Sequence, residues 1–182
     1  MRRLSPLVPS LVLLLAACAK GPALESDWER NNRDRLSQGE AEVAALPPYP
    51  KSENLVQFYV SAATDFKYFI DGSTLTVQPR QKIVRYVLVA RSRNGVDNVS
   101  YEAIHCPEEY RVLAVGQGDS WDSRPGEWRA ITKGSSLSWP YALARNYFCP
   151  HRDAIRTTEE GIDALRRGGH PAVSVEQRNL GY

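Results

Sequence analysis

The alternation of apolar and polar side chains is most regular over Ile83–Cys106, where two β-rich runs flank Asn94–Gly95. An Asn-Gly pair between two such runs is typical of a hairpin closed by a two-residue type I′ turn. This turn sets Tyr86 opposite Ala103. Because successive side chains of a strand point to opposite faces, it also gives the hairpin one continuous apolar face. We therefore expect this hairpin to be the central ribbon of a sheet.

In the same register, the other face of the hairpin carries more polar side chains. Arg85 and Glu102 lie there as a diagonal cross-strand pair, which is typical of a surface salt bridge. His105 is expected on the apolar face, beside Val84. A shift of one residue would exchange the two faces, so these placements depend on the register.

Further short strands are predicted on either side of this hairpin by the same period of two residues. Asp71–Gly72 also separates two β-rich runs, so a second hairpin is expected there, with Tyr68 opposite Leu75. The remaining strands are expected at Leu55–Ala62, Glu109–Val115 and Trp128–Ile131.

The hydrophobic period then changes to that of a helix, which begins after Ser136 or Ser138 and ends near Phe148. Pro140 is compatible with the first turn of this helix. Its apolar stripe is expected to lie on the apolar face of the sheet. The elements together predict an α+β fold with a single twisted antiparallel sheet of about five to seven strands and a C-terminal helix packed on one face.

The first residues of the chain have the features of an export signal. Two arginines precede the apolar run Leu7–Leu15, which is too short to cross a bilayer as a helix. The sequence Leu15–Cys18 (LAAC) resembles the lipobox of bacterial lipoproteins. That resemblance implies cleavage before Cys18, attachment of lipid to its thiol and acylation of the new N-terminus, for example with palmitate. Lys20, in place of Asp, favours sorting to the outer membrane; an ordinary secretory signal is the alternative.

The composition divides the chain into four parts. Residues 1–17 form the signal peptide, residues 18–45 a polar flexible tether, and residues 46–150 the folded domain. Residues 151–182 are expected to form a short helix, started by a capping box at Thr157 and Glu160, and a loose tail. The proline-rich Leu46–Pro50 is either a ligand for a partner or a strap packed on the domain's own surface, and the second is favoured.

Charge and hydrophobicity limit the class of protein. A hydrophobic fraction of 42% is enough to form a core. The formal net charge is +2, from 23 basic and 21 acidic residues, and loss of the two leader arginines (23 − 2 = 21) leaves none. A balanced charge gives no reason to expect binding to nucleic acid.

Three cysteines are present, and lipid on Cys18 would leave Cys106 and Cys149. The nearby His105 and His151 raise zinc binding as an alternative to a disulfide. His105 and Cys106 are neighbours on a strand and point to opposite faces, however, so both cannot easily reach one ion. Export to an oxidising compartment favours the Cys106–Cys149 disulfide. No metal and no other cofactor is predicted.

Catalytic patterns are sparse, because no nucleophile, base and orienting group occur together in a known arrangement. The sequence therefore predicts a protein that is not an enzyme. Residues with a possible binding role are aromatic or charged side chains that the core does not require, and tryptophans at the ends of the sheet have packing against the core as the alternative role. The candidate binding surface consists of Tyr59, Arg85, Tyr101, Glu102, Trp121 and Trp128.

Four stretches resemble one known family: LPPYPKSENLVQFYVSAATDFKYFIDGSTLTV, VRYVLVARSRNGVDNVSYEAIHC, EYRVLAVGQGDSW and YFCP. They are similar to the cryptic neisserial protein-like family, a set of uncharacterised bacterial envelope proteins that often carry lipoprotein signals. The resemblance covers about Leu46–Pro150. It implies the boundaries of the domain and the pairing of Cys106 with Cys149, and it supplies no catalytic residues.

These observations predict a non-catalytic envelope protein, anchored by lipid to the outer membrane and facing the periplasm. Its partner would be the membrane, through Cys18, and an envelope protein or the cell wall, through the folded domain. Surface exposure is the alternative orientation. The alternative function is a periplasmic small-ligand binder or minor hydrolase, whose pocket would be lined by Tyr59, Tyr101, Glu102 and Trp121.

Overall fold

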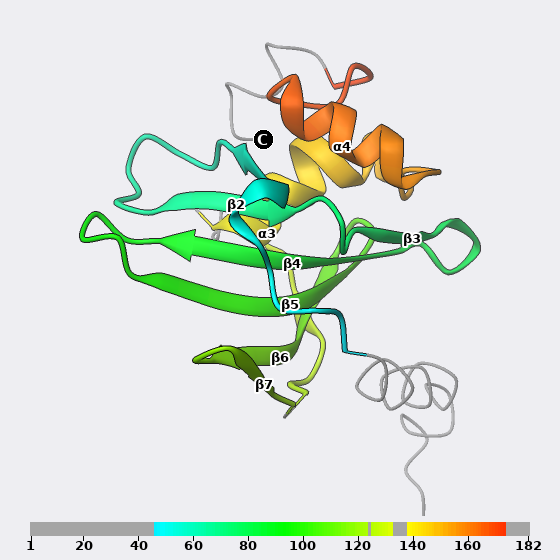
Figure 1. The fold of residues 1–182 in the computed structure, drawn as a ribbon. Coiled ribbons are helices and arrows are strands. Elements are labelled where there is room, and N and C mark those ends of the chain that lie inside the picture. Colours follow the sequence, from blue (N-terminus) through cyan, green and yellow to red (C-terminus); the bar gives the residue numbers. More distant parts are fainter. Residues whose placement is uncertain (1–45, 124, 133–137, 174–182) are drawn as a thin grey trace, which may run out of the picture.

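A computed structural model describes residues 46–123, 125–132 and 138–173. The predictions for the signal peptide, for Cys18 and for the tether lie outside these residues. The described chain forms an antiparallel sheet with helices on one side (Figure 1). The predicted α+β fold is therefore confirmed.

The sheet has eight strands, of which six follow one another in the order β1-β2-β4-β5-β6-β7. The short β3 pairs with β4, and β8 pairs with β6. The strands are β1 (Leu55–Phe58), β2 (Lys67–Asp71), β3 (Thr76–Gln78), β4 (Ile83–Arg91), β5 (Asp97–His105), β6 (Glu109–Gln117), β7 (Ser120–Asp122) and β8 (Arg129–Ala130).

The helix predicted to end near Phe148 is present as two joined segments. An α-helical turn, α3 (Trp139–Leu143), continues as the π-helical η4 (Ala144–Phe148), with Ser138 at the N-cap and Pro140 in the first turn. A second helix, α4 (Thr158–Arg166), lies on the same side of the sheet (Figure 1). Short 3₁₀ turns are η1 (Ser52–Asn54), η2 (Pro79–Gln81) and η5 (Pro150–Arg152).

Both faces of the sheet bury apolar side chains. The larger core lies under the helices, and its most buried members include Tyr86, Leu88, Ile104, Tyr147, Phe148 and Leu165. The smaller core, here called the second face, lies on the opposite side and consists of Ile83, Val87, Tyr101, Ala103, Leu113 and Ala114. Because α4 contributes Ala164 and Leu165 to the larger core, this helix is part of the folded unit.

The loop between β4 and β5 contains three residues, Arg93–Gly95, and not the predicted two. The N–H of Ser92 donates to the Val96 carbonyl at 2.9 Å, and the N–H of Gly95 donates to the Ser92 carbonyl at 3.0 Å. Gly95 has a φ of 80°, a conformation that glycine adopts without steric cost. A turn followed by such a glycine is the usual form of a three-residue hairpin loop.

This loop shifts the strand pairing by one residue, so the predicted register is wrong. Tyr86 pairs with Glu102 and not with Ala103. Glu102 consequently points to the helix side, whereas Ala103 belongs to the second face. The predicted diagonal pair of Arg85 and Glu102 is also wrong, because the two side chains lie on opposite faces of the sheet. His105 likewise lies on the second face, near Trp128.

The hairpin predicted at Asp71–Gly72 does not form. The Asp71 carboxylate accepts hydrogen bonds from the Ser73 N–H at 2.9 Å and the Ser73 hydroxyl at 2.6 Å, a local arrangement typical of aspartate in turns. The chain then continues along the same edge of β4. Tyr68 pairs with Ala90 of β4 and not with Leu75, while β3 pairs further along β4.

Cys106 and Cys149 form the predicted disulfide, which joins the end of β5 to the end of η4. The two cysteines are 43 residues apart in the sequence. For a loop of this size, the chain-entropy model gives a stabilisation of about 4 kcal/mol. The bond therefore restrains the helix side of the core against the central hairpin.

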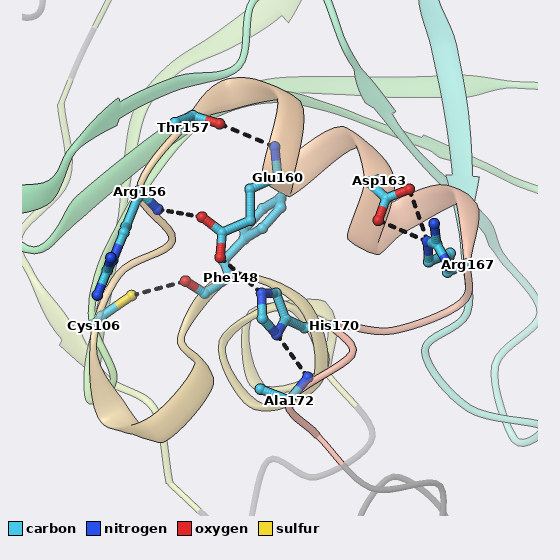
Figure 2. A network of polar contacts seen from close by, with 9 residues as sticks. All are labelled: Cys106, Phe148, Arg156, Thr157, Glu160, Asp163, Arg167, His170 and Ala172. Atoms are coloured by element: carbon cyan, nitrogen blue, oxygen red, sulfur yellow. Dashed lines mark hydrogen bonds and ion pairs between the residues drawn. The ribbon is translucent and has the colours of Figure 1, made fainter.

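The predicted cap of the last helix is also confirmed (Figure 2). The Thr157 hydroxyl accepts a hydrogen bond from the Glu160 N–H at 3.2 Å, and the Glu160 carboxylate accepts one from the Arg156 N–H at 2.7 Å. Glu160 also lies 2.9 Å from His170 Nε2, and His170 Nδ1 accepts a hydrogen bond from the Ala172 N–H at 3.1 Å. The start of the predicted loose tail is thus buried and hydrogen-bonded.

The proline-rich segment Leu46–Pro50 is a strap on the domain's own surface. Leu46 packs against the second face. The indole N–H of Trp121 donates to the Pro47 carbonyl at 2.8 Å, and the ring centroids of Tyr49 and Trp121 are 5.3 Å apart. The favoured reading of this segment is confirmed.

Gly116 permits this close approach of the strap, which gives a test. A Cβ at this position would lie 2.6 Å from the Tyr49 hydroxyl and 2.8 Å from Val99 Cβ. We expect Gly116→Ala to displace the strap and to lower the free energy of unfolding by about 1–3 kcal/mol. Urea unfolding and limited proteolysis near residues 46–50 measure the two effects.

Gly126→Ala is the matched control, because a Cβ there would meet only the Val112 carbonyl oxygen, at 3.6 Å. Equal stability and equal protease resistance of the two variants would contradict the packing described for the strap.

Candidate functional site

The six residues predicted to form one binding surface lie at three separate places. Four share the second face, namely Arg85, Tyr101, Trp121 and Trp128. Glu102 lies in the core under the helices, and Tyr59 follows β1 at the outer end of the sheet. The predicted pocket of Tyr59, Tyr101, Glu102 and Trp121 is therefore wrong, because only Tyr101 and Trp121 lie together.

Glu102 is the most unusual polar residue of the larger core, since its exposure is 0%. Its carboxylate accepts hydrogen bonds from the Ser100 hydroxyl at 2.6 Å, the Tyr86 hydroxyl at 3.1 Å and the Trp139 indole N–H at 2.9 Å. These donors come from β5, β4 and α3. Burial of an acid in this way requires such partners, so the network fixes the start of α3 against the centre of the sheet.

Burial raises the pKa of Glu102, although the three hydrogen bonds act in the opposite direction. The same burial, together with the nearby carboxylate, raises the pKa of Tyr86 well above its ordinary value. Glu102 lines neither of the two cavities described below. We therefore assign it a structural role in the core, in place of the predicted role on a binding surface.

The second face contains two buried arginines in one row across three strands. Arg85 on β4 and Arg111 on β6 are both opposite Ala103 on β5, and their exposed fractions are 5% and 9%. The Arg85 guanidinium donates to the Gln78 side-chain oxygen at 3.1 Å. The Arg111 guanidinium lies 6.0 Å from the centre of the Trp128 ring. Burial lowers the pKa of Arg85, and the phenol of Tyr101 opposes this shift.

The tryptophans on this face serve as packing groups. The Trp121 ring lies 6.4 Å from the Tyr101 ring and 5.3 Å from the Tyr49 ring of the strap. Trp128 packs edge-on against His105, with ring centroids 6.0 Å apart. Both tryptophans thus pack against the core, which is the alternative role expected for them. The second face is therefore covered and not an open binding surface.

Tyr59 is different, because 63% of it is exposed. It lies in a hollow of about 320 Å³, here called the edge groove, lined by residues 57–61, 64 and 66–68 and, from the end of α4, by residues 165, 166 and 168. Phe66, at 39% exposure, is the second exposed aromatic side chain of the groove. Lys67 and Arg166 supply its two positive charges, and none of the lining residues is acidic.

The backbone beneath this exposed ring is held from the core. The Tyr147 hydroxyl accepts a hydrogen bond from the Tyr59 N–H at 3.2 Å and donates one to the Tyr59 carbonyl at 3.1 Å. The Tyr147 ring in turn packs against Phe58, with ring centroids 5.7 Å apart. Tyr59 therefore presents a solvent-facing ring on a restrained backbone, an arrangement that suits a binding residue.

A second cavity, of about 640 Å³, lies beside the disulfide. Cys149, Tyr141 and Ile131 line it together with His151 and Arg152, which both have left-handed backbone conformations with φ of 54° and 67°. Arg152 forms an ion pair with Glu108 across its rim.

The fold and the groove define an α+β protein with a candidate binding site. The sequence model of the CNP1-like family matches residues 35–166, which include the whole sheet and α4. This chain therefore belongs to the CNP1-like (cryptic neisserial protein-like) family, as its sequence resemblance indicates. The family is uncharacterised and assigns no molecular role. No curated protein and no solved structure matches the chain.

Residues 46–123, 125–132 and 138–173 contain no group of three or more His, Cys, Asp or Glu side chains placed to hold a metal ion. No helix in these ranges is both long enough and apolar enough to span a bilayer.

The raised pKa of Glu102 predicts a dependence of stability on pH. Between the ordinary carboxyl pKa and the raised value, the folded protein binds the proton more tightly than the unfolded chain does. The contribution of Glu102 to stability therefore falls as pH rises through that window. Glu102→Gln keeps the shape of the side chain and has no charge to bury. We expect its free energy of unfolding to increase relative to that of the wild type as pH rises through the window. Urea unfolding from about pH 4 to about pH 8 measures this.

The exposed Glu159 provides the control, since Glu159→Gln removes a carboxylate that is not buried. This variant should follow the wild-type pH dependence. Identical pH dependence in Glu102→Gln and the wild type would show that Glu102 titrates normally in the folded state.

Proposed function

We propose that this chain is a non-catalytic protein of the bacterial envelope, anchored by lipid on Cys18 to the outer membrane. Its folded domain faces the periplasm and binds a partner, either another envelope protein or the cell wall. The residues that contact this partner are those of the edge groove, with Tyr59 at its centre.

The sequence around Cys18 supports the anchor. A basic start, a short apolar run and the residues LAAC occur in the order of a lipoprotein signal. The Cys106–Cys149 disulfide agrees with export, because such bonds persist in oxidising compartments. Anchoring through several acyl chains would be stable, whereas a single chain binds membranes only marginally.

One observation supports binding above all others, namely the exposure of Tyr59 over a backbone that Tyr147 holds in place. A solvent-facing aromatic ring on a restrained backbone loses little conformational entropy when it is covered. Phe66 adds a second exposed ring in the same hollow. Tyrosine at such positions is frequent among the residues that dominate binding energy.

The anchor predicts a defined covalent modification of the mature protein. We expect intact-mass measurement of the membrane-extracted protein to give residues 18–182 plus a diacylglyceryl group and an amide-linked acyl chain. Cys18→Ala should lack this added mass and should not partition into detergent. A free Cys18 thiol in the mature wild-type protein would contradict the proposed anchor.

The binding role predicts contacts at Tyr59 in living cells. A photo-crosslinking amino acid placed at position 59 should give adducts with an envelope partner, because this side chain lies in the groove. The same residue at position 115 is a matched control, since Val115 is 46% exposed on β6, which β2, β4 and β5 separate from β1. Electrophoresis and mass spectrometry identify the adducts. The same adducts at both positions, or none at position 59, would contradict the proposal.

A further inference from the structure

The edge groove combines exposed aromatic rings with positive charge. Tyr59 and Phe66 offer ring faces, while Lys67 and Arg166 approach from β2 and α4. These two cations form no ion pair with a carboxylate of the described residues. The acids nearest to them in sequence are already paired, Asp65 with Arg93 and Asp163 with Arg167. The groove therefore presents a net positive charge beside two apolar rings.

The connection between β1 and β2, which forms part of the groove, is braced by its own hydrogen bonds. The Ser61 hydroxyl accepts a hydrogen bond from the Ala63 N–H at 3.1 Å, and the Thr64 hydroxyl accepts one from the Phe66 N–H at 3.3 Å. Thr64 also lies 3.3 Å from the Tyr68 hydroxyl, which anchors this connection to β2. Because these bonds are local, the loop that carries Phe66 keeps its shape without a ligand.

These features together select a ligand with three properties. It must have flat apolar faces that stack on Tyr59 and Phe66, hydroxyl or amide groups that suit Gln57 and Ser61, and negative charges that suit the two cations. A chain of amino sugars that bears carboxylates has all three. The hollow of about 320 Å³ lies at the small end of the usual range for ligand sites, so it would take a short segment of such a polymer.

We propose that the edge groove binds a carboxylate-bearing glycan of the cell wall. The proposal rests on the proposed function and names the chemistry of the partner. The aromatic rings supply most of the affinity by covering the sugar faces. Lys67 and Arg166 supply selection for the charged form, since a neutral glycan leaves both cations without a counter-charge.

The test uses the mature full-length protein in detergent and purified peptidoglycan sacculi in a co-sedimentation assay. We expect the protein to bind intact sacculi. Its affinity for sacculi whose carboxylates have been amidated should be lower by a factor of about ten or more. Tyr59→Ala should weaken binding to intact sacculi about tenfold or more, as expected for a central aromatic residue. The double variant Lys67→Glu/Arg166→Glu should lose the preference for unamidated sacculi. Its binding to sacculi should also depend less on salt concentration than wild-type binding does.

Two matched variants control for unfolding and for general charge. Val115→Ala changes an exposed apolar residue on β6, which β2, β4 and β5 separate from β1, and Arg80→Glu reverses an exposed charge on η2. Both should bind like the wild type. Each variant is also compared with the wild type by urea unfolding, so that a loss of fold is recognised separately from a loss of binding.

The outcomes separate the ligand class from the binding role. Equal binding to intact and amidated sacculi, or full binding by Tyr59→Ala, would overturn the glycan proposal. Binding to phosphatidylglycerol vesicles that depends on the same residues, without binding to sacculi, would also overturn it and assign the groove to a lipid surface. In those cases adducts at position 59 in cells would still support a binding role, whereas their absence would remove both proposals.

Discussion

Between β4 and β5 the chain reverses through Arg93–Gly95, and hydrogen bonds of Ser92 and Gly95 close that loop. This reversal sets the pairing of β4 and β5 at the centre of the sheet, and with it the face to which each of their side chains points. Glu102 enters the core under the helices, and Arg85 enters the second face. Each charged group is then buried and needs its own polar surroundings, which several elements have to supply together.

Those surroundings explain how the helices are held. The Glu102 carboxylate binds the indole of Trp139 at the start of α3, while the Cys106–Cys149 disulfide restrains the other end of the same helical segment. Along that segment, the hydroxyl of Tyr147 reaches the backbone of Tyr59. The larger core thus holds the backbone of Tyr59 through this side chain. Phe58, Val60, Tyr68 and Leu165 belong both to that core and to the lining of the edge groove, so the groove is supported from within.

The local parts of this fold could be predicted from the sequence. A proline in a first turn, a Thr157–Glu160 cap and two cysteines in a chain with an expected export signal each depend on a few adjacent residues or on one pairing. The register could not be predicted in this way. Two-residue and three-residue loops both accommodate Asn94–Gly95, and the choice depends on contacts made across the whole sheet.

The error at Glu102 follows from that one residue of register, because a two-residue turn places its side chain on the polar face of the hairpin. Its three hydrogen-bond donors come from separate elements that no local pattern connects. The hairpin expected at Asp71–Gly72 would place Phe66 in a paired strand, whereas Phe66 precedes β2 and is 39% exposed in the groove. Tyr59 was predicted correctly as exposed, because its position opposite the apolar face of β1 needs only the period of two.

The contact between Tyr147 and Tyr59 also affects how the molecule meets copies of itself. β1 is the outermost strand at its end of the sheet, and an outer strand with free backbone groups can pair with the same strand of another molecule. Here one hydroxyl occupies both the N–H and the carbonyl of Tyr59, directly after a strand of only four residues. The length of edge open to such pairing is correspondingly short, which protects the sheet from edge-to-edge aggregation at high local concentration.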